Sequence, residues 1–127
     1  MGSVTCVCFD ACGYRWALEA RHVRRIDSTL SLARHAAFET LLCDSPGQPT
    51  RWLTLVDRQG PWQLGLPSDS VLLPLPSAAL HPLPPLLAAR VRHPALCGIA
   101  VVAQSLTLLL NGAQLRLPTT SGSVGEP

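Results

Sequence analysis

Short apolar and β-branched runs, separated by polar turns, recur along the chain and predict a mostly β protein. Residues 4–9 and 14–18 flank a polar turn in which Gly13 tolerates a positive φ angle. Residues 51–56 and 61–66 flank a second polar turn in the same way. Each pair of runs predicts an antiparallel β-hairpin.

A third hairpin is expected towards the C-terminus. The apolar runs 96–103 and 106–110 are separated only by Gln104 and Ser105, and so short a gap favours a tight turn. Residues 118–127 consist mainly of Thr, Ser, Gly and Pro, so we expect a disordered tail.

The middle of the chain combines a helical spacing with a proline-rich stretch. Residues 30–42 place apolar side chains at roughly helical intervals after a serine that can serve as an N-cap, which predicts a helix. Five prolines lie within residues 73–85 and exclude a long helix or a central strand there. We expect a rigid connection with a short helical turn at residues 77–80. A brief helix or a loop follows at residues 85–90.

Composition bears on the surface and on nucleic-acid binding. Charged residues make up 14% of the chain, well below the roughly 25% of an ordinary soluble domain. Such a surface is either partly covered by a partner or simply plain. The net charge is only +2, and the cluster of Arg21, Arg24 and Arg25 has no aromatic stacking platform beside it. Nucleic acid is therefore not an expected partner.

No secretion signal or membrane span is evident in the hydropathy pattern. The N-terminal residues lead directly into a strand-like run without a basic start. The apolar runs are all shorter than the roughly 18–20 residues that cross a bilayer. The expectation is a cytoplasmic protein without direct membrane insertion.

The five cysteines are expected to be structural thiols. An odd number fits a reducing cytosol. Cys6 and Cys8 are two residues apart on a predicted strand, so they face the same side as small buried side chains. The alternative is a zinc site formed by Cys6, Cys8 and Cys12 with His22, but no second cysteine pair is available to complete it. No metal or other cofactor is expected.

Catalytic chemistry is not indicated. The four histidines lie outside any recognisable catalytic motif, and no phosphate-cradling glycine loop or nucleophile motif is present. Trp16, Trp52 and Trp62 each lie on a predicted strand. We expect them in the core, although tryptophan is also enriched at protein interfaces.

Several short motifs occur in an order that resembles one family. The second half contains Leu64-Gly65-Leu66, Asp69-Ser70-Val71, Leu73-Pro74-Leu75-Pro76, Leu96-Cys97-Gly98-Ile99-Ala100 and a leucine run before Leu115. The first part contributes Phe9, Gly13, Tyr14, Ala17, Leu18, Val23 and Ile26. Together, over residues 4–26 and 51–116, these motifs resemble the CheW-like chemotaxis coupling proteins.

This resemblance implies a CheW-like fold of two small packed β-barrel lobes. Family members place a Gly-x-x-Asn-x-Arg-Gly-like stretch and a Pro-Val strand after the Val-x-x-Ile step. Here Ile26 is followed within a few residues by the expected helix. The chain is therefore expected to be a shortened member, with residues 1–117 as one domain and one short helix. The incomplete first lobe would span about residues 1–43, and the second about residues 51–117.

The resemblance also implies a non-enzymatic adaptor that docks to the cytoplasmic tip of a chemoreceptor, a methyl-accepting chemotaxis protein. Whether it also couples to the kinase CheA, as a full coupling protein does, stays open, as does a small β-barrel module that binds a ligand or metal. An unpaired edge of the first lobe would accept a strand from a partner, from another CheW-like protein or from a second copy in a homodimer. The expected contact residues are Arg21, Val23, Arg24, Arg25 and Ile26.

Overall fold

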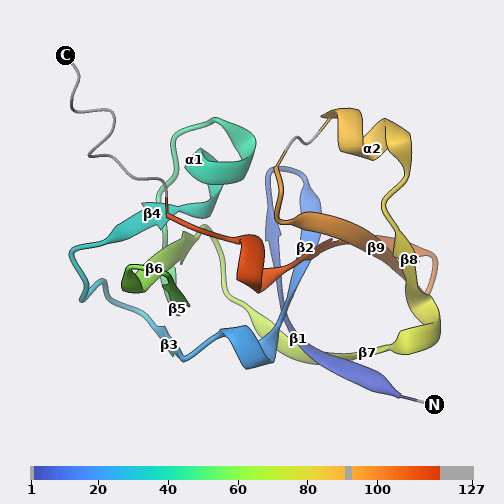
Figure 1. The fold of residues 1–127 in the computed structure, drawn as a ribbon, viewed down its shortest axis with the longest axis horizontal. Helices are drawn as coiled ribbons and strands as arrows, with labels where there is room; N and C mark the ends of the chain where they lie inside the picture. The colour runs from blue at the N-terminus through green and yellow to red at the C-terminus, as the bar shows by residue number, and fades with distance from the viewer. Residues whose placement is uncertain (1, 91–92, 118–127) are drawn as a thin grey trace.

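The computed structural model describes residues 2–90 and 93–117, and these form two β-sheets with short helices in the connections between strands (Figure 1). One sheet has six strands in the order β7-β1-β2-β10-β9-β8, and it curls into a half-barrel. The other has four strands in the order β3-β5-β6-β4. The prediction of a mostly β fold is confirmed.

The three predicted hairpins are all present. They consist of β1 (Ser3–Ala11) with β2 (Tyr14–Glu19), β5 (Arg51–Asp57) with β6 (Gly60–Leu66), and β9 (Leu96–Val102) with β10 (Ser105–Leu110). At the first turn, Cys12 and Gly13 have φ angles of 58° and 82°. At the last turn, Ala103 and Gln104 have φ angles of 49° and 67°, so this turn begins one residue earlier than expected. Paired positive φ angles match the right-handed twist of the flanking strands.

The predicted helix over residues 30–42 is largely wrong. Only its end is helical, as α1 (Phe38–Cys43), and it is preceded by the short strand β4 (His35–Ala37), which runs parallel to β6. The buried side chain of Gln63 on β6 explains the difference. Its Oε1 accepts hydrogen bonds from the backbone N–H groups of Ser31 and Leu32, both at 2.8 Å. A buried carbonyl oxygen needs donors, and this extended segment provides two of them for Oε1.

The prolines of the middle region lie at the two edges of the six-stranded sheet. β7 (Val71–Pro76) pairs only with β1, and β8 (Leu80–Pro82) pairs only with β9. Proline has no N–H to donate, so it is tolerated on edge strands. The predicted short helical turn is present as η2 (Ser77–Ala79), and the brief helix is α2 (Pro85–Arg90).

Both faces of β1 are buried, because the sheet separates two hydrophobic clusters. The larger cluster fills the space between the sheets and includes Phe9, Trp16, Phe38 and Trp62. Aromatic ring centroids of Phe9 and Trp16 each lie 4.9 Å from that of Phe38. The smaller cluster lies against the other face of the sheet and consists of the small or branched side chains Cys6, Cys8, Ala17, Leu75 and Ala100. Core placement is thus confirmed for Trp16 and Trp62, whereas Trp52 is half-buried.

Each of the two sheets combines strands from both halves of the chain. Strands from the first 43 residues are divided between both sheets, and so are strands from residues 51–117. The expected tail at residues 118–127 lies outside the described residues. No helix in the described part of the chain is long and apolar enough to cross a membrane.

Candidate interaction site

Four of the five expected contact residues lie together around one surface groove. The chain leaves β2 through the 3-10 turn η1 (Ala20–His22) and enters the four-stranded sheet as β3 (Arg25–Asp27). The groove measures about 370 Å³. Its lining residues are Val7, Ala20, Val23, Arg24, Arg25, Ile26 and Leu72. Arg21 lines a neighbouring cavity instead, which it shares with Arg24.

The groove lies between two sheet edges. β3 is the terminal strand of the four-stranded sheet, and β7 is a terminal strand of the six-stranded sheet (Figure 1). Leu72 on β7 is the cross-strand partner of buried Val7, so an apolar pair forms one wall. Ile26 on the other side is 44% exposed and Leu72 is 59% exposed. This site therefore offers apolar side chains beside the terminal strands of both sheets.

Arginines give this groove a basic rim. The β3 backbone is positioned by pairing with β5, and the N–H of Arg24 donates to the carbonyl of Thr54 at 2.8 Å. Arg25 forms an exposed ion pair with Asp27 at 3.0 Å. Arg24 forms no ion pair with any residue in 2–90 or 93–117. Its charge is therefore available to an acidic partner.

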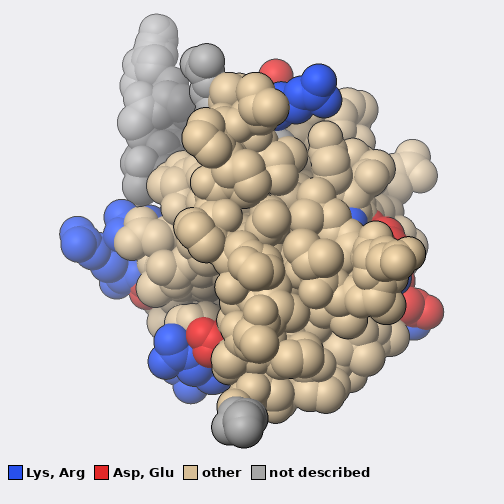
Figure 2. All heavy atoms as spheres, turned by 90° about the vertical axis from the view of Figure 1, so that its right-hand side faces the viewer, with Lys and Arg blue, Asp and Glu red and all other residues tan. Residues whose placement is uncertain are grey.

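A second surface is notable for its lack of charge. Figure 2 shows the side of the molecule that lies on the right in Figure 1, and the centre of this face carries no Lys, Arg, Asp or Glu side chain. Strands β7, β9 and β10 and helix α2 expose large apolar side chains, namely Leu73, Leu86, Val101, Val102 and Leu106. The centre of this face is thus an uncharged, partly apolar surface.

The expectation of five reduced structural thiols is wrong for two cysteines. Cys12 in the β1–β2 turn forms a disulfide with Cys43 at the end of α1, across 31 residues of sequence. Their Cα atoms are 6.4 Å apart, within the usual range for a disulfide. This bond joins the first hairpin to the segment that follows β4. Spacing along the sequence gave no signal for it.

The other three cysteines are free thiols, two of them buried and one at the surface. Cys6 and Cys8 are buried on the same face of β1, and burial, with a smaller effect of Cys8 and Glu19, raises the pKa of Cys6 to about 11. Cys97 is free and exposed. Among the described residues, no group of three or more His, Cys, Asp or Glu side chains is arranged to hold a metal ion.

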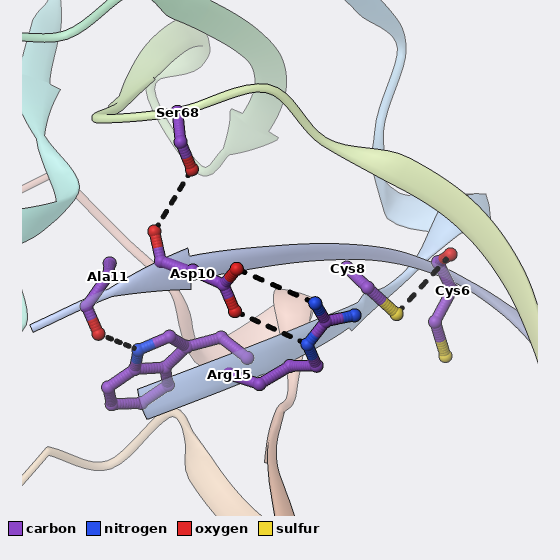
Figure 3. Close-up of polar contacts among 7 residues, drawn as sticks. Cys6, Cys8, Asp10, Ala11, Arg15 and Ser68 are labelled. Atoms are coloured by element: carbon purple, nitrogen blue, oxygen red, sulfur yellow. Dashed lines mark hydrogen bonds and ion pairs between the residues drawn. The ribbon is translucent and has the colours of Figure 1, made fainter. Parts of the chain in front are cut away.

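Polar contacts hold the tip of the first hairpin in place (Figure 3). Asp10 forms an ion pair with its cross-strand neighbour Arg15 at 3.3 Å, and its carbonyl accepts a hydrogen bond from Ser68 Oγ at 3.1 Å. The indole Nε1 of buried Trp16 donates to the carbonyl of Ala11 at 2.8 Å. The hairpin is therefore tied both to itself and to the segment before β7.

Three of the four histidines have structural contacts that account for them. His35 packs edge-on against Trp52, with ring centroids 5.6 Å apart. His93 Nδ1 accepts from the N–H of Ala95 at 3.0 Å, and burial lowers the pKa of this imidazole. The ring of His22 lies so close to Gly112 that a Cβ there would be 2.5 Å from its Cγ. Through these contacts the three histidines pack against neighbours or stabilise a turn.

Comparisons with known proteins give a fold similarity without a sequence match. No protein-family model matches the sequence, and no curated protein matches it. Among solved structures, the fold is similar to that of the scaffolding protein TtCheW from Thermoanaerobacter tengcongensis, with a TM-score of 0.69. The similarity covers 87% of this chain and 84% of that one at 12% sequence identity. The likeness to a CheW-type fold is therefore one of architecture.

Proposed function

We propose that this protein is a non-enzymatic adaptor of a bacterial chemosensory system that docks to the cytoplasmic tip of a chemoreceptor. The observation that carries the proposal is the groove between β3 and β7, which gathers residues 23–26 on a fold similar to that of a CheW scaffolding protein. These are the residues that the sequence resemblance links to partner contacts. The adaptor would act in the cytoplasm, at receptor clusters.

The chemistry of the groove defines the partner segment that it would bind. Val7 and Val23 lie under the opening, and the exposed side chains of Ile26 and Leu72 flank it. Arg24 lies at the rim without an ion-pair partner among the described residues. A segment with apolar anchors and at least one carboxylate next to them would complement this surface. Docking would desolvate the apolar walls and leave the charge contact at the exposed rim.

A full coupling protein that bridges the receptor and CheA is the second candidate. Bridging requires two separate surfaces, and the uncharged face in Figure 2 is distinct from the groove. That face would hold CheA, another CheW-like protein or a second copy of this chain. An adaptor that uses only the groove would leave the kinase unbound.

The test is a pair of binding titrations with a receptor-tip fragment and with the regulatory domains of CheA. Ile26→Asp places a charge in the groove and should abolish receptor binding. Leu106→Asp, on the exposed part of β10, is the matched variant and should leave receptor binding unchanged. If CheA binds and only Leu106→Asp weakens it, the protein is a full coupling protein. Failure of the wild-type protein to bind either partner would overturn the proposal and favour a small ligand-binding module.

A further inference from the structure

Next to the groove lies a cavity of about 420 Å³ whose walls carry four arginines. Arg21 and Arg24 come from the connection after β2, Arg58 from the β5–β6 turn, and Arg116 from the segment after the 3-10 turn η3 (Gly112–Gln114). These three segments are far apart in the sequence. The tertiary structure alone brings the four guanidinium groups to one cavity.

The positive charge of this cavity is not neutralised by its own walls. Asp57 is the one carboxylate among the described lining residues. Its Oδ2 accepts from Arg34 at 2.7 Å and its Oδ1 accepts from the N–H of Gln59 at 2.8 Å, so it is already engaged. Arg21 is paired with Glu19 at 2.9 Å.

The remaining three arginines have no such partner. Arg24, Arg58 and Arg116 form no ion pair within residues 2–90 and 93–117. Three unpaired guanidinium groups around one small cavity repel one another unless an anion lies between them. A ligand with at least two negative charges would relieve this repulsion.

One wall of the cavity is closely packed. Gly112 lies directly against the ring of His22, where a Cβ would be only 2.5 Å from the ring Cγ. Val56 is the one large apolar side chain among the lining residues of this cavity. Phosphate oxygens would find several N–H donors in this cavity.

We infer that this cavity binds a diphosphate group, held by Arg24, Arg58 and Arg116. Guanidinium groups present paired N–H donors whose geometry matches phosphate oxygens, and a diphosphate carries enough charge for three of them. Occupancy would connect the β5–β6 turn of one sheet to the segment that follows β10 of the other. This cavity shares Arg24 with the receptor groove, but its other two arginines lie outside the groove, and the inference does not depend on the proposed function.

Calorimetric titration with inorganic pyrophosphate at constant ionic strength tests the inference. We expect saturable binding of one pyrophosphate per protein. Arg58→Gln and Arg116→Gln should each weaken it by about tenfold, the effect of losing one charge-assisted contact. Arg90→Gln removes the same charge from α2, outside the cavity, and should change the affinity by less than about twofold. Circular dichroism of each variant checks that the fold is retained.

Two further measurements separate this site from non-specific attraction and from the groove. Pyrophosphate should shift the amide resonances of Gly112 and Ala113, and Ile26→Ala, which alters the groove without adding a charge, should bind it as the wild type does. ADP carries the same diphosphate group and should also bind here, with its affinity likewise weakened in Arg58→Gln. Absence of saturable binding, or an equal loss in Arg90→Gln and Arg58→Gln, would overturn the inference.

Discussion

Arg34 donates a hydrogen bond from Nη2 to Oδ2 of Asp57 at 2.7 Å, and the same guanidinium donates from Nη1 to the carbonyl of Gly60 at 3.1 Å. These contacts fasten the extended segment before β4 to the β5–β6 turn. The carboxylate is 7% exposed. Burial on its own would raise the pKa of Asp57, but hydrogen bonds from Arg34 and Gln59 hold the pKa below its ordinary value of 3.8.

Asp57→Asn should therefore destabilise the protein in a pH-dependent way. A carboxyl whose pKa is lower in the folded state stabilises the fold above its ordinary pKa, and that contribution disappears as the pH falls through the lower, folded value. At pH 7 we expect a loss of about 1–3 kcal/mol, typical of a broken charged hydrogen bond. Urea unfolding at pH 7 and below pH 3 measures the difference, which should shrink at the lower pH.

Asp69→Asn provides the matched control. Its carboxylate pairs with Arg51 at 2.9 Å but is 74% exposed. Exposed ion pairs contribute about 0–1 kcal/mol, so this variant should change stability little at either pH. An equal effect of both substitutions would show that the environment of Asp57 is not what stabilises the turn.

Gln63→Leu should release the segment that precedes β4. The substitution leaves the N–H groups of Ser31 and Leu32 without their acceptor, at a cost of about 1–3 kcal/mol for each group that stays buried. Hydrogen exchange at these two amides should accelerate more than exchange in the β1–β2 hairpin. Gln59→Leu, at an exposed position of the same hairpin, should leave their exchange unchanged.

Reduction of the Cys12–Cys43 bond should lower stability without changing the fold. The bond closes a loop across 31 residues, and a cross-link of this length stabilises by about 3–4 kcal/mol. Thermal unfolding with and without a reductant measures this difference in the wild type. The double variant Cys12→Ser/Cys43→Ser should match the reduced protein and show no response to the reductant.

The three remaining thiols should react with a thiol reagent in a defined order. Cys97 is exposed and should be modified first, although partial desolvation raises the pKa of its thiol. Cys6 and Cys8 are buried, and burial raises the pKa of both, so little thiolate is present at neutral pH. Mass spectrometry of the oxidised protein over time should show one rapid and two slow modifications. Cys97→Ser should remove only the rapid one.

Much of the strand structure was predictable because a β-hairpin is determined by residues that lie close together in the sequence. The hairpin between β1 and β2 follows from two apolar runs around Gly13, whose φ of 82° few other residues adopt readily. For residues 73–85 the prolines correctly excluded a central strand, although a rigid connection was expected where the structure has the edge strands β7 and β8. Their prolines cannot donate to a neighbouring strand, so these segments could pair on one side only.

The errors occur where distant residues decide the local conformation. Residues 30–34 have helical spacing, yet the N–H groups of Ser31 and Leu32 donate to the side chain of Gln63, about thirty residues later. Cys12 and Cys43 pair because α1 packs beside the first turn, which no spacing rule indicates.

The sequence by itself therefore determined the β class and the hairpins, and it suggested Arg21, Val23, Arg24, Arg25 and Ile26 as contact residues. Only the tertiary structure decided which of these residues share a surface. It placed Ile26 opposite Leu72 in the groove and placed Arg24 beside Arg58 and Arg116 at the cavity. The reason is physical: strand pairing within a hairpin needs only local contacts, whereas a groove or a charged cavity exists only once two sheets have packed together.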